Sequence, residues 1–156
     1  MIKLCMNQFL YFDMTGTYKF IDHTADIAAE VSAENYNDLF IASADVWKES
    51  VVEDFSSDKL EEKEIEISDR SLEELLVHFL SELNYLLLVK GWIFSEVKEI
   101  SVEESENQFE AKLKILGEPV DENKHILKIE IKAVTFHQMN IKYGDGKYRT
   151  RIVFDI

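Results

Sequence analysis

The strongest local signal in this chain is SLEELLVHFLSELNYLL, residues 71–87. It opens with a capping box, Ser71-x-x-Glu74, in which the hydroxyl and the carboxylate satisfy free amide groups of the first helical turn. Eight apolar residues then recur three and four positions apart, in a stripe that ends before Gly91. Each of them stabilises a fold by roughly 1.5–3 kcal/mol when fully buried. The pattern predicts a central core helix, with a partner-binding helix as the alternative. The eight residues are Leu72, Leu75, Leu76, Phe79, Leu80, Leu83, Leu86 and Leu87.

Around this helix, the spacing of apolar residues predicts the other elements. A second helix is expected from Glu34, with Ser32 available as its N-cap. A period of two predicts most of the strands, and Gly144-Asp145-Gly146 is typical of a tight hairpin turn. We therefore expect an α+β fold: a single two-layer domain with a mostly antiparallel sheet and two main helices packed on one face. The predicted strands are residues 18–21, 27–33, 61–68, 97–103, 109–116, 126–134, 139–143 and 148–154.

The amino-acid composition excludes some classes of protein. The 156 residues include 31 acids and 17 bases, for a net charge of −14, and 46% of them are hydrophobic. Such a chain forms a compact domain rather than a disordered one. Because the acidic excess repels phosphates, we expect no direct grip on nucleic acid, and metal ions or a protein with a basic face are the plausible companions. We assign residues 14–156 to one domain and residues 1–13 to a possible N-terminal extension, since Met14 could be the start.

The cellular compartment follows from what the chain contains. Its one cysteine, Cys5, cannot form an internal disulfide, which fits a reducing compartment. The N-terminal stretch does not resemble a signal peptide, because Asn7, Gln8 and Asp13 interrupt its apolar positions. No apolar run approaches the roughly 20 residues that span a bilayer. We expect a cytoplasmic protein that does not bind membranes.

Histidines offer little chemistry on their own. His78 falls within the apolar helix and is expected at its surface, and His125 is expected to be solvated in a charged turn. His23 and His137 each interrupt apolar strands beside a threonine, but neither has metal-binding spacing. Histidines in such settings are more often structural than functional.

Carboxylates are the remaining candidates for a functional site, as ligands of a metal ion. Asp22 and Asp26 flank a loop between strands, where a hard cation could find oxygen ligands. The chain ends on Phe154-Asp155-Ile156, so a side-chain carboxylate and the terminal carboxylate lie on adjacent residues. If this end is a strand docked in the sheet, two anionic groups are held at its tip. Acids are abundant here, however, and taken alone most of them are expected to be merely solvated.

Three separated segments favour a functional role for some of these acids: DHTADI at 22–27, IKAVTFH at 131–137 and VFDI at 153–156. Together they resemble the archease family, and the likeness extends over residues 18–156. The resemblance implies a small accessory protein for the GTP-dependent RNA-splicing ligase that joins tRNA exon halves. Such a protein promotes guanylylation and multiple turnover of the ligase and has no catalytic activity of its own. Members are also associated with chaperone-like modulation of a tRNA methyltransferase.

The resemblance also implies a site. Its metal ligands carry over to Asp26, Asp155 and the terminal carboxylate of Ile156, an all-oxygen set that suits Ca²⁺, Mg²⁺ or Mn²⁺. Lys132 and His137 belong to a segment implicated in activity, and His23 lies beside the first ligand. Phe136 stands where the family usually has a tyrosine, which removes a hydroxyl and any hydrogen bond that it would make from that position.

Two rival functions stay open at this point. One is a general folding or solubility factor whose acidic surface shields basic RNA-processing enzymes and needs no metal. The other is a metal-dependent hydrolase that uses the same carboxylates with His23 or His137 as base. The sequence shows no nucleophile motif or substrate pocket for the hydrolase.

Overall fold

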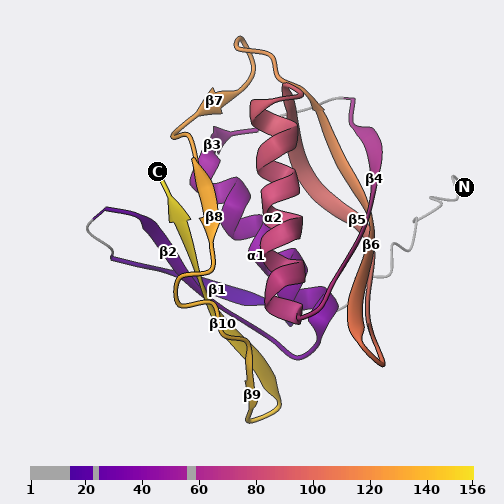
Figure 1. Cartoon of the computed structure of the whole chain (residues 1–156). Helices are drawn as coiled ribbons and strands as arrows, with labels where there is room; N and C mark the ends of the chain where they lie inside the picture. Colours follow the sequence, from indigo (N-terminus) through magenta and orange to yellow (C-terminus); the bar gives the residue numbers. More distant parts are fainter. Residues whose placement is uncertain (1–14, 23–24, 56–58) are drawn as a thin grey trace, which may run out of the picture.

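The computed structural model describes residues 15–22, 25–55 and 59–156; Cys5, the predicted extension 1–13 and His23 lie outside them. The described residues form two helices and ten strands (Figure 1). The predicted α+β class, with two main helices and antiparallel strands, is confirmed. In chain order the elements are β1 Thr17–Ile21, β2 Ile27–Ala33, α1 Tyr36–Val51, β3 Val52–Asp54, β4 Glu61–Asp69, α2 Leu72–Leu88, β5 Trp92–Ser105, β6 Gln108–Pro119, β7 Ile126–Leu127, β8 Ala133–Thr135, β9 Lys142–Gly144 and β10 Lys147–Asp155.

The strands divide into three sheets. The largest has the order β1-β2-β10-β8, with β9 also paired to β10; β4-β6-β5 and β3-β7 form the other two. Helix α1 contacts β2 and β5, and α2 contacts β4, β5 and β8, so both helices pack against both larger sheets (Figure 1). The expected single sheet with helices on one face is therefore not what the structure has.

Helix α2 is the core helix that residues 71–87 predicted. The Ser71 hydroxyl accepts a hydrogen bond from the Glu74 amide at 3.1 Å, and the Glu74 carboxylate accepts from the Arg70 amide at 3.2 Å. All eight residues of its apolar stripe are buried. His78 lies on the exposed side, as predicted, 2.9 Å from a carboxylate oxygen of Asp69.

Helix α1 begins differently from the prediction. Its N-cap is Asn35, whose side-chain oxygen accepts from the Asp38 amide at 2.8 Å. Ser32 is not the cap, because it belongs to β2 and its hydroxyl bonds that of Thr17 at 3.0 Å. The helix therefore starts later than Glu34.

The predicted strand 126–134 is wrong as one element. It divides into β7 and β8, and the backbone between them bonds to other partners. The Lys128 amide donates to the carbonyl of Val51 at 2.7 Å, and the carbonyl of Ile131 accepts from the Asn84 side chain at 2.7 Å. Because these partners lie at the end of α1 and on α2, the segment crosses the helices instead of extending a sheet.

The last two strands form the predicted hairpin. Gly144 pairs with Lys147, and the two residues between them both have positive φ, 52° at Asp145 and 76° at Gly146. This is the backbone of a type I′ turn, which matches the twist of the flanking strands. In the described residues, no helix is long and apolar enough to cross a membrane.

Candidate functional site

The candidate site lies at the C-terminal end of β10, which is an inner strand of the largest sheet. Strand β10 runs between β2 and β8, with Phe154 opposite Ile27 and Asp155 opposite Ala133. Asp26 lies in the bend just before β2, and Asp155 follows Phe154 on β10, so the last β2–β10 pair separates them by one residue on each strand. The prediction that the terminus is a strand docked in the sheet is confirmed, and it brings the ends of two segments together whose acids are 129 positions apart in the sequence.

Lys132 reaches the same place from the segment before β8. Its backbone amide donates to the carbonyl of Asp155 at 2.8 Å, and its ammonium group donates to a terminal carboxylate oxygen of Ile156 at 3.2 Å. The Lys132 side chain is exposed, so solvent screens this ion contact. The backbone bond nevertheless fixes where Lys132 stands relative to the chain end.

A hollow of about 450 Å³ opens beside Asp26. Its lining includes Asp22 and Asp26 from the β1–β2 connection, Glu49 from α1, and Lys128 from the segment after β7. The Lys128 ammonium group donates to the backbone carbonyl of Glu49 at 3.0 Å. The hollow thus gathers three acids and one base at the same end of the sheet as the terminus.

Oxygen donors dominate this end of the molecule, which is what a hard cation requires. In the described part of the chain, no three His, Cys, Asp or Glu side chains are grouped so that they could hold a metal ion. Of the predicted ligands, Asp26 and Asp155 have side-chain carboxylates, and the third is the terminal carboxylate of Ile156. The chemistry of this set fits Ca²⁺, Mg²⁺ or Mn²⁺ better than a thiolate-seeking metal.

His137 lies away from this group. In β8, Ala133 pairs with Asp155 and Thr135 pairs with Val153, so the chain moves away from the terminus as it approaches His137. The Gln138 side chain accepts from the Arg151 guanidinium at 3.0 Å, which places this turn about four residues, or roughly 13 Å, along β10 from Asp155. His137 and the neighbouring Phe136 are both exposed. His23 lies outside the described residues.

The prediction that His125 is solvated is wrong. His125 is buried, not solvated: its Nε2 lies 2.7 Å from a carboxylate oxygen of Glu118, and its ring stacks on Phe55. The Asp121 amide donates to its Nδ1 at 2.9 Å, so Nε2 carries the proton that is donated to Glu118. Only the folded chain shows this pair, because both residues sit in a charged stretch that reads as surface.

A family model described as the Archease protein family (MTH1598/TM1083) matches residues 18–156. The chain belongs to the archease family. Its relatives include Protein archease of Pyrococcus abyssi, 35% identical over 136 residues that cover 86% of this chain and 95% of the relative. Protein archease of Methanopyrus kandleri is 34% identical over 138 residues, which cover 87% and 96% of the two chains.

Solved structures of archease-family proteins share the fold. The solution structure of Methanobacterium thermoautotrophicum protein 1598 matches with a TM-score of 0.75 and 26% identity, covering 89% of this chain and 98% of that one. A 2.0 Å crystal structure from Thermotoga maritima, described as an archease and possible chaperone, matches with a TM-score of 0.53 and 25% identity, covering 88% and 96%. The resemblance seen in the three sequence segments is therefore confirmed over most of the chain.

Proposed function

We propose that this protein activates a GTP-dependent RNA-splicing ligase, promoting its guanylylation and multiple turnover in tRNA splicing, through a divalent-metal site at the chain terminus. Membership of the archease family supports the class of function. The observation that supports the site is the β2–β10 register, whose last pair, Phe154 opposite Ile27, directs Asp155 and the chain end toward Asp26. In this proposal the protein is not itself an enzyme, and the ligase performs the chemistry.

In this proposal, each residue of the site has a positioning role. Asp26, Asp155 and the terminal carboxylate hold the cation, which supplies positive charge for nucleotidyl transfer when bound. Lys132 holds one terminal carboxylate oxygen through its ammonium group at 3.2 Å and fixes Asp155 through its backbone amide at 2.8 Å. Strand β10 is hydrogen-bonded on both sides, so the acids are presented at a rigid tip that could enter a partner's active-site mouth.

An assay of ligase guanylylation tests the proposal. Stimulation by Asp26→Ala, Asp155→Ala and Lys132→Ala proteins is compared with stimulation by the unmodified chain. The matched controls are Glu122→Ala and Lys124→Ala, which remove one acid and one base from the exposed turn between β6 and β7. The site variants should lose most of the stimulation, and the controls should keep it. Full stimulation by all three site variants would refute the proposal.

The terminal carboxylate has its own test. Adding residues after Ile156 converts this carboxylate to an amide and removes a charged oxygen donor. Calorimetric titration with Ca²⁺, Mg²⁺ or Mn²⁺ should then show weaker binding than in the unextended chain, and the metal should raise the unfolding temperature less. The same extension at the N-terminus is the control. Equal metal affinity in the two extended proteins would exclude the terminal carboxylate as a ligand.

A second candidate is a chaperone-like modulator of a tRNA methyltransferase or of other RNA-processing enzymes. It is favoured by the description of the Thermotoga maritima relative as a possible chaperone. In this function charge acts diffusely, so suppression of methyltransferase aggregation should be the same with Asp26→Ala as with Glu122→Ala. Incubation of the protein alone with RNA, nucleotide and divalent metal tests whether it is an enzyme, and we expect no product.

A further inference from the structure

Strand β1 forms an edge of the largest sheet, and in the described part of the chain it pairs with β2 alone. A strand that is paired on one side leaves the amide and carbonyl of every second residue pointing away from the sheet. Among the described residues, none outside β2 bonds to the backbone of residues 17–21. Strand β1 therefore offers free hydrogen-bonding groups to another strand.

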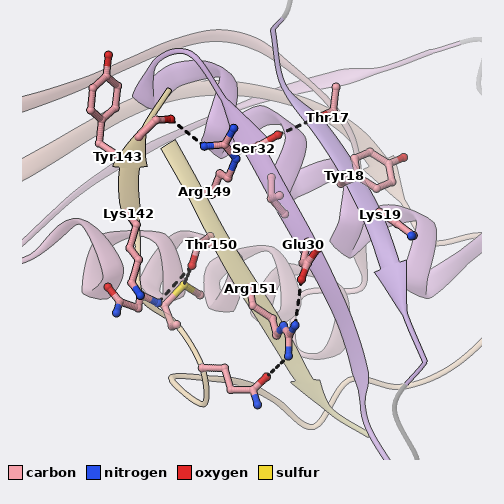
Figure 2. Close-up of a pocket in the computed structure, with 15 residues that line it drawn as sticks. Thr17, Tyr18, Lys19, Glu30, Ser32, Lys142, Tyr143, Arg149, Thr150 and Arg151 are labelled. Atoms are coloured by element: carbon pink, nitrogen blue, oxygen red, sulfur yellow. Dashed lines mark hydrogen bonds and ion pairs between the residues drawn. The ribbon is translucent and has the colours of Figure 1, made fainter. Parts of the chain in front are cut away.

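A row of alternating charges on the outer face of the sheet leads to this edge (Figure 2). Arg151 of β10 pairs with Glu30 of β2, and Glu30 pairs with Lys19 of β1. The Arg151 guanidinium donates to the Glu30 carboxylate at 2.9 Å, so these two charges neutralise each other. Lys19 ends the row, is exposed, and has no ion-pair or hydrogen-bond partner among the described residues. A carboxylate on an added strand, opposite Lys19, would continue the alternation.

The surroundings of Lys19 favour an acid at that position. A hollow of about 790 Å³ lies on this face, and its charged residues are four cations and one anion, a net charge of +3. Besides the row already described, they include Lys142 and Arg149. The local charge is thus positive in a chain whose net charge is −14, and a carboxylate is attracted here although most of the surface repels it.

The opposite side of β1 is aromatic. Tyr18 and Phe20 pair with buried residues of β2, so they point to the helix-facing side of the sheet. Their rings meet edge to face, with centroids 6.0 Å apart. The Tyr18 hydroxyl donates to the Glu49 carboxylate at 2.6 Å, which orients the ring and leaves Tyr18 37% exposed. Apolar side chains of an added strand would lie against these two rings, where they bury the most apolar surface.

A second copy of this chain does not suit the edge. In the antiparallel register that pairs all five residues of β1 with those of another β1, the middle residue, Lys19, faces itself. Like charges directly opposite each other destabilise a strand pair, and a lysine on an edge strand commonly prevents such self-pairing. The charge that blocks a copy is the one that would attract an acidic residue of a different segment.

We propose that β1 accepts an extended segment of another protein as an added strand. In this segment an acidic residue lies opposite Lys19, and apolar residues lie opposite Tyr18 and Phe20. Backbone hydrogen bonds supply affinity in this mode of recognition, and the alternating side chains supply specificity. A nucleotide or an RNA strand would meet Lys19 but has no peptide backbone to pair with β1. The inference does not rest on the proposed ligase or on the terminal metal site.

Nuclear magnetic resonance titration of the full chain with two capped peptides at 150 mM salt is the test. The peptides are Thr-Thr-Val-Glu-Val-Thr-Thr and the same sequence with lysine in place of glutamate. The glutamate peptide should bind at least about threefold more tightly, although the net charge of −14 favours the lysine peptide. At a concentration ten times its Kd, it should slow hydrogen exchange at every second amide of β1 about tenfold.

Variants of Lys19 separate the added strand from general attraction between charges. Lys19→Gln should remove the preference for the glutamate peptide, and Lys19→Glu should reverse it. The control is Lys142→Glu, which makes the same change of charge at an exposed position on the same face but on β9, and it should keep the preference. Circular dichroism checks that each variant keeps the fold.

Four results would overturn the proposal. They are no binding of the glutamate peptide at 1 mM, binding that leaves exchange in β1 unchanged, tighter binding of the lysine peptide to the unmodified chain, and an equal change of preference in Lys142→Glu. Exchange in β1 that slows as the concentration of the chain itself rises would assign the edge to a second copy, and the proposal would also fail.

Discussion

Asn84 joins three parts of the fold through one buried side chain. Its Oδ1 accepts from the Trp47 indole N–H of α1 at 3.3 Å, and its Nδ2 donates to the carbonyl of Ile131 at 2.7 Å. Asn84→Ala leaves both partners without a bond in the core, at roughly 1–3 kcal/mol each. The better helix propensity of alanine returns at most about 0.7 kcal/mol. We therefore expect the free energy of unfolding to fall by roughly 1.5–5 kcal/mol.

Urea unfolding followed by circular dichroism measures this loss. With a slope of about 1–3 kcal/mol per molar urea, the midpoint should move down by on the order of 1–2 M while the slope stays unchanged. The control is Asn140→Ala, at an exposed position whose side chain has no hydrogen-bond partner in the described residues, and it should stay within about 0.5 kcal/mol. If Asn84→Ala cost less than 1 kcal/mol, the two buried groups would have other partners and the reasoning would fail.

Three further predictions concern stability. Gly117→Ala should destabilise strongly, because a Cβ there would clash with the backbone carbonyl oxygen of Ile93 on the paired strand β5. Thermal melting checks this, with Gly144→Ala, where a Cβ would meet open space, as the control. Glu118→Ala should cost roughly 1.5–3 kcal/mol by stranding the buried His125 donor, and Glu118→Gln, which keeps an acceptor, should cost less. Burial raises the pKa of Asp45, so its charged form opposes folding; Asp45→Asn should raise the melting temperature at pH 7, and a gain that does not shrink toward pH 4 would contradict this.

Charges of opposite sign lie on the same strand of the largest sheet. On β10, Asp155 and Arg151 are four residues apart, so their side chains point to the same face and are separated by roughly 13 Å.

Local interactions explain what could be predicted from the sequence. Three features could be predicted because each depends on residues within a few positions of one another in the sequence. They are the N-cap of α2, its apolar stripe and the turn at 144–146. The α+β class follows from these signals. The segment 126–134 shows the limit: its alternation looks like a strand, but bonds to Val51 and Asn84 divide it.

The sequence by itself determined the acidic charge, the helices, most of the strands and, through three short segments, the family. Only the tertiary structure decided how the strands divide into three sheets, that His125 is buried, and that His137 stands apart from Asp155. It also decided that Lys19, Lys142, Arg149 and Arg151 of a strongly acidic chain gather on one face of the largest sheet. For these strand residues the physical reason is register, which is set by the faces that bury apolar surface across the whole domain, and a shift of one residue would turn their side chains to the other side.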